Sequence, residues 1–230
     1  MRWLCALFGI LLLPVCVAAT VSVFAPFMAP APAGAAPLLP GAAWALLLGF
    51  LLWLFMYFAL PRPLWSYVLA HELTHALWGW AMGAHVHGIG FSRHGGTARL
   101  SKTNVLITLA PYFCPFYTVM VIAAYGVSAL FFNVRPYDLF WIGLVGFTWG
   151  FHISFTISSL RLEQPDLRIY GAFFSLVLIY LLNMVVLALL IVFVSQMTFA
   201  QWATAFGENL WQVLAWVTGW AGRLWNAHAP

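Results

Sequence analysis

Residues 64–82, LWSYVLAHELTHALWGWAM, decide the fold of this chain. The stretch is apolar throughout, apart from His71, Glu72, His75 and a few uncharged polar side chains. About 20 such residues form a helix long enough to cross the hydrocarbon core of a bilayer. Because backbone polar groups inside lipid must pair within their own segment, the stretch predicts a transmembrane helix. Its ionisable residues lie near the middle of that helix.

The whole chain has the composition of a membrane protein. Of its 230 residues, 64% are hydrophobic and 6% are charged, and the mean hydropathy is +0.96. A soluble domain carries about 25% charged residues, and a disordered chain has low hydrophobicity, so both classes are excluded. The nine Lys and Arg residues are scattered singly and form no basic stripe. We therefore expect membrane lipid as a partner, and no nucleic acid.

The hydrophobic pattern predicts an all-α polytopic membrane protein with about six transmembrane helices. The six segments are 3–25, 42–60, 64–82, 104–132, 139–160 and 168–195. We expect the first to be retained rather than removed as a signal peptide, because its apolar run is long. We expect a multi-pass protein that lies in a bacterial inner membrane or a plasma membrane.

Around these spans the sequence divides into four predicted regions. They are an N-terminal transmembrane helix (1–25), a Pro/Ala-rich linker (26–41), a membrane core (42–195) and an amphipathic, Trp-rich C-terminal segment (196–230). The last region predicts a helix lying along the membrane interface, with a short seventh span as the alternative. Within the core, the polar stretch 83–103 has Gly95-Gly96 between two runs of alternating residues, which predicts a small β-hairpin.

The residues His71, Glu72 and His75 form an HExxH motif, the strongest chemical signal in the chain. Two His residues at positions i and i+4 share one helix face about 6 Å apart, so both imidazoles can bind one Zn²⁺. The Glu between them can act as the general base toward water. Charged residues inside membrane helices are costly, which favours a functional site. The alternative is a hydrogen-bonded polar cluster that fixes helix packing.

Zinc requires at least a third protein ligand, and a catalytic zinc keeps one position open. Asp166 follows Pro165 at the break between two spans, and its carboxylate can point back into the helix bundle. We rank Asp166 first as the third ligand and His152, near the middle of span 139–160, second. A solvated loop acid and a hydrogen-bonded packing residue are the respective alternatives. His152 is also a candidate to orient a ligand or to donate to a developing oxyanion.

The segment YVLAHELTHAL, residues 67–77, resembles the zinc helix of the site-2 protease family of intramembrane zinc metallopeptidases. In that family an Asp near the start of a later helix supplies the third ligand. Here Gln164-Pro165-Asp166-Leu167 matches the Pro-Asp core of that motif, with Leu167 in place of Gly.

Two weaker features extend this resemblance over about residues 64–180. Residues 85–103 resemble the β-hairpin that often follows the zinc helix in the family. The stretch 109–115, LAPYFCP, stands where family members carry a Gly-Pro-rich central helix, but Tyr112 replaces the Asn that often follows the proline.

The resemblance implies an intramembrane zinc metalloprotease. Glu72 would be the catalytic base, His71, His75 and Asp166 would bind Zn²⁺, and the substrate would be a transmembrane protein or peptide. The alternative is a non-catalytic zinc-binding membrane protein that acts as a subunit of a larger complex. The short chain and the Trp-rich tail are compatible with an oligomer or with accessory subunits.

Overall fold

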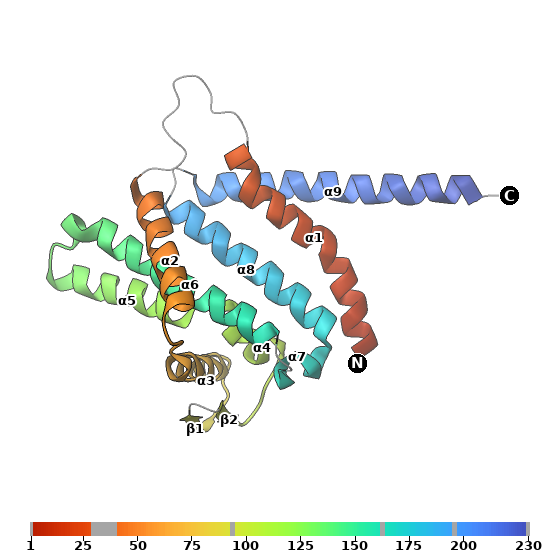
Figure 1. Cartoon of the computed structure of the whole chain (residues 1–230). Helices are drawn as coiled ribbons and strands as arrows, with labels where there is room; N and C mark the ends of the chain where they lie inside the picture. The colour runs from red at the N-terminus through yellow and green to blue at the C-terminus, as the bar shows by residue number, and fades with distance from the viewer. Residues whose placement is uncertain (1, 29–40, 93–94, 162–163, 195–196, 229–230) are drawn as a thin grey trace, which may run out of the picture. The chain divides into compact units, whose positions relative to one another are not determined.

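The computed structural model in Figure 1 describes residues 2–28, 41–92, 95–161, 164–194 and 197–228. The chain folds as two compact units, Leu39–Tyr170 on the one hand and Met1–Leu38 with Gly171–Pro230 on the other. Both units are mostly helical. Residues 29–40 of the expected Pro/Ala-rich linker lie outside the described residues.

The unit Leu39–Tyr170 contains the HExxH segment. Its helices are α2 (Gly41–Ala59), α3 (Leu64–Ala81), α4 (Val105–Phe113), α5 (Phe116–Phe131), α6 (Asp138–Leu160) and α7 (Pro165–Tyr170), with a short 3-10 turn at Arg135–Tyr137. Helix α2 ends at Ala59 and α3 begins directly after Pro63, because proline lacks an N–H to donate and drives the residue before it out of the helical region.

The predicted hairpin is confirmed. Strands β1 (Val86–Ser92) and β2 (Gly95–Leu100) pair antiparallel, with Ile89 opposite Ala98 and an irregularity between Val86 and Gly88. Gly95 has a φ of +148°, which only glycine adopts readily. Both strands pack against α3.

The expected continuous span 104–132 is interrupted. Helices α4 and α5 meet at an angle of 77° across Cys114 and Pro115. Cys114 has an extended backbone and Pro115 precedes the first residue of α5, because a residue before proline is driven out of the helical region. As a result α4 is a separate short helix, and every residue in it from Ile107 to Phe113 is buried.

A close crossing of α2 and α6 forms much of the interior of this unit. Gly49 of α2 and Gly146 of α6 lie directly against the backbone of the opposite helix, where even a methyl group would overlap a carbonyl oxygen. Beside the glycines, Trp53 and Phe151 join a cluster of buried rings with Tyr57 and Phe155.

The other unit contains α1 (Arg2–Met28), α8 (Ala172–Val194) and α9 (Phe199–His228). A small core of Val23, Ala188 and Trp202 joins these three helices. The span expected at 168–195 begins later than predicted: α7 ends at Tyr170, and Gly171 with a φ of +94° separates it from α8.

Among the described residues, four helical segments are long and apolar enough to cross a membrane. They are Arg2–Phe24, Gly41–Ala59, Arg135–Leu160 and Ala172–Val194, with a fifth if the bent pair α4 and α5 counts as one span. Helix α3 is not among them, because its His, Glu, Ser and Thr residues lower its hydropathy. The structure thus confirms a mainly helical chain, but with four or five candidate spans among the described residues instead of about six.

Candidate metal centre

Helix α3 presents His71 and His75 on one face, as their spacing predicts. Their ring centroids are 4.9 Å apart, and both side chains are largely buried. The helix is continuous from Leu64 to Ala81, so the two imidazoles are held one turn apart by the backbone itself. The pair therefore offers two imidazole nitrogens at a fixed spacing, which could bind one metal ion.

Asp166 completes the cluster from the first turn of α7. Its Oδ2 atom lies 3.5 Å from Nε2 of His71 and 3.5 Å from Nε2 of His75. Pro165 begins α7, so the Asp side chain leaves the chain at a helix start. Within the described part of the chain, these three side chains are the group of His, Cys, Asp or Glu residues that could hold a metal ion, with ligand atoms all within 4.8 Å of one another.

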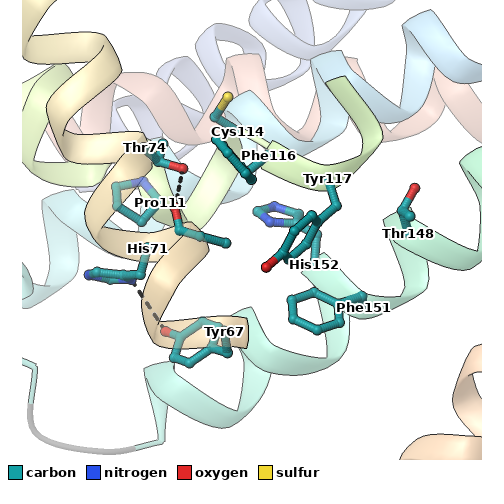
Figure 2. Close-up of a pocket in the computed structure, with 11 residues that line it drawn as sticks. Tyr67, His71, Thr74, Pro111, Cys114, Phe116, Tyr117, Thr148, Phe151 and His152 are labelled. Atoms are coloured by element: carbon teal, nitrogen blue, oxygen red, sulfur yellow. Dashed lines mark hydrogen bonds between the residues drawn. The ribbon is translucent and has the colours of Figure 1, made fainter. Parts of the chain in front are cut away.

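The two histidines also have contacts on their other ring nitrogens. Nδ1 of His75 lies 2.9 Å from the backbone carbonyl of Ile107, and Nδ1 of His71 lies 3.4 Å from the hydroxyl of Tyr67 (Figure 2). A carbonyl oxygen only accepts, so Nδ1 of His75 carries a proton and donates it to Ile107, which leaves Nε2, the atom facing Asp166, as the one available to a metal. Metal-binding histidines are commonly oriented by such a bond.

The surroundings of Asp166 favour the ionised form of its carboxyl. Burial alone would raise the pKa of its carboxyl, but the hydrogen bonds and charges of His71 and His75 outweigh burial and lower the pKa below the ordinary value. The hydroxyl of Tyr112 donates a further hydrogen bond to Oδ2 at 3.1 Å. A carboxylate held in this form can bind a metal without first losing a proton.

Glu72 lies beside the cluster and beneath the hairpin. Its side chain is buried, and its carboxylate accepts a hydrogen bond from the backbone N–H of Ala98 in β2. A Cβ added to Gly96 would lie 2.7 Å from Oε1 of Glu72, so the backbone of β2 touches the carboxylate. The hairpin therefore sets the position of this acid.

The structure places His152 outside the three-residue group. His152 is buried on α6 and lines a cavity of about 20 Å³ together with His71, Tyr67 and Thr148 (Figure 2). A cavity of this size has room for one water molecule. Of the two candidates for the third position, the structure thus brings Asp166 to the histidine pair, while His152 faces the adjoining cavity.

Sequence reasoning missed the support that α4 and β2 give to the cluster. The carbonyl of Ile107, the hydroxyl of Tyr112 and the backbone of Gly96 and Ala98 all contact site residues. Backbone groups carry no sequence signal, and a tyrosine next to Pro111 in an apolar segment is a weak one.

Comparisons with protein-family models, with curated proteins and with solved structures found no match for this chain. The chemistry of the centre is therefore inferred from its own residues and their geometry.

Proposed function

We propose that this chain is an intramembrane zinc metalloprotease that hydrolyses a peptide bond of a membrane-embedded protein or peptide. The observation that carries the proposal is the meeting of His71, His75 and Asp166, with Glu72 held in the same helical turn. Two imidazoles, one carboxylate and an adjacent Glu are the donor set and base of many zinc hydrolases.

The geometry of the donor atoms fits zinc. In a tetrahedral site with bonds of about 2.0–2.1 Å, two ligand atoms lie roughly 3.3–3.4 Å apart. The distances from Oδ2 of Asp166 to the two Nε2 atoms are both 3.5 Å. These two distances are close to those of a tetrahedral zinc site, and the three donor atoms all lie within 4.8 Å of one another.

Large apolar side chains on the surface support a membrane setting. Phe55 and Phe58 of α2 and Leu130 of α5 are 69%, 76% and 78% exposed. Water-soluble proteins rarely show extended apolar surface of this kind, whereas lipid tails cover it at no cost. The substrate is accordingly proposed to be a transmembrane segment rather than a soluble protein.

The roles of the residues follow from their positions. A bound zinc ion would polarise the scissile carbonyl and lower the pKa of a water molecule. Glu72 accepts the proton of the attacking water and then donates it to the leaving amine. The N–H of Ala98 holds the Glu72 carboxylate in place, and burial keeps bulk water away from it.

A non-catalytic zinc protein is the second candidate function. A structural zinc site is usually closed by four protein ligands. Among the described residues, the group that could hold a metal ion (His71, His75 and Asp166, the metal group) offers three potential ligands and no fourth. This count favours a catalytic site with one open position, and it leaves the buried Glu72 with a chemical role.

Zinc content and cleavage together test the proposal. Detergent-purified wild-type protein is expected to hold about one zinc per chain, and His75→Ala and Asp166→Asn are expected to lose it. His87→Ala is the matched control, because His87 is an exposed histidine of β1 outside the metal group. Glu72→Gln is expected to retain zinc and to lose cleavage of a reconstituted transmembrane substrate.

Each of three results would contradict one part of the proposal. Full cleavage by Glu72→Gln would refute the role of this acid. Zinc bound equally by wild type and Asp166→Asn would refute the three-ligand centre. Zinc bound without any cleavage by wild type, across a panel of single-span substrates, would favour the non-catalytic function.

A further inference from the structure

Tyr112 is fully buried on α4, next to the metal centre. Its hydroxyl donates to Oδ2 of Asp166 at 3.1 Å, and its ring meets the ring of His71 edge-on, with centroids 5.4 Å apart. The residue therefore contacts two members of the metal group at once. Its side chain reaches them from a helix that contributes no ligand itself.

The oxygen that Tyr112 contacts is the one that faces both histidines. Oδ2 of Asp166 lies 3.5 Å from each Nε2 atom, so this oxygen is the one positioned to bind a metal. A carboxylate oxygen has two lone pairs. With one lone pair directed at a metal, the other accepts the Tyr112 hydrogen bond, which fixes the rotation of the carboxylate about its Cβ–Cγ bond.

Contacts at both ends of helix α4 restrict the position of Tyr112. Asn104 caps its first turn by accepting a hydrogen bond from Ile107 N–H at 2.9 Å, and the bend at Pro115 ends it after three turns or fewer. The same helix supplies the Ile107 carbonyl that orients His75. One short buried helix thus orients two of the three ligands.

We propose that Tyr112 is a positioning residue that holds Asp166 as a ligand through a single oxygen. This inference rests on the metal centre of the proposed function and adds a cause for its open position. A carboxylate that binds through one oxygen fills one coordination site, whereas a freely rotating carboxylate can bind through two. The hydroxyl of Tyr112 therefore keeps a zinc site three-ligated, with room for water and substrate.

The substitution Tyr112→Phe removes the hydroxyl and keeps the ring, so it tests the hydrogen bond to Asp166 separately from ring packing. The matched control is Tyr125→Phe, because Tyr125 also donates to an aspartate, Asp138, at 2.9 Å but lies away from the metal group. Zinc affinity is measured by competition with a chelator. Loss of an outer hydrogen bond to a ligand typically weakens metal binding by about 10–100-fold, which is the expected result for Tyr112→Phe. No change is expected for Tyr125→Phe.

Two further readouts separate positioning from packing. The visible absorption of the Co²⁺-substituted protein reports coordination number, and Tyr112→Phe is expected to shift it toward the weaker bands of five-coordinate Co²⁺. Melting temperatures with and without zinc are the second readout. The variant is expected to match wild type without zinc and to gain less on zinc addition.

Three outcomes would overturn the inference. Zinc affinity and a Co²⁺ spectrum equal to those of wild type would show that the hydroxyl does not position Asp166. A melting temperature lowered equally with and without zinc would assign Tyr112 to packing alone. Failure of wild type itself to bind zinc would reject the metal centre, and with it both the proposed function and this role.

Discussion

Replacing Gly96 by Ala tests the contact between the hairpin and the proposed base. A Cβ at position 96 would lie 2.7 Å from Oε1 and 2.8 Å from Cδ of Glu72, and nearer still to Cγ. Carbon atoms pack favourably at about 3.5–4.0 Å. The new methyl group and the Glu72 side chain must therefore separate by roughly 1 Å.

Either partner of this contact can give way, and each movement harms the site. Glu72 is 7% exposed, so its side chain has little space to rotate. If β2 moves instead, the Ala98 N–H leaves the carboxylate. Misplacing a catalytic group by about 1 Å costs on the order of 100-fold in rate. We expect a loss of that size for Gly96→Ala, with zinc content unchanged, because the nearest atoms to the new methyl all belong to Glu72.

The assay is the cleavage rate of a reconstituted transmembrane substrate, read beside zinc per chain. Gly90→Ala is the matched control in the same hairpin, since its Cβ would lie 3.5 Å from the Thr97 hydroxyl, an ordinary contact distance. Gly96→Ala with the wild-type rate would refute the contact between β2 and Glu72 in the working protein. An equal loss in Gly90→Ala would trace the effect to the hairpin as a whole.

Three predictions concern stability. Gly146→Ala is expected to destabilise the protein by about 3 kcal/mol, because its methyl group would overlap the Leu46 backbone at the α2–α6 crossing. Gly126→Ala, on α5 with open space around it, is expected to be neutral or to stabilise by about 0.5–1 kcal/mol. Asn104→Ala removes the cap of α4 and is expected to cost about 1 kcal/mol of unfolding free energy. Chemical denaturation in detergent measures all three; wild-type stability in Gly146→Ala would contradict the close crossing, and wild-type stability in Asn104→Ala would show that the cap is dispensable.

Local pattern determined much of this protein from the sequence alone. The apolar runs indicated most of the helices, because hydrophobicity and proline act over a few neighbouring residues. The alternation on either side of Gly95 predicted the hairpin, since strand pairing there needs only a short turn. The spacing of His71 and His75 placed both on one face, because helical periodicity alone sets that geometry.

Tertiary structure decided what sequence spacing left open. Asp166 and His152 were both candidates for the third ligand, and only the packing of α7 against α4, which itself packs on α3, brought Asp166 within 3.5 Å of both histidines. The bend between α4 and α5 turned one expected span into two helices and carried Tyr112 to Asp166. Such contacts join residues far apart in the chain, and they depend on how packed helices fill space. No local pattern of residue types encodes that arrangement.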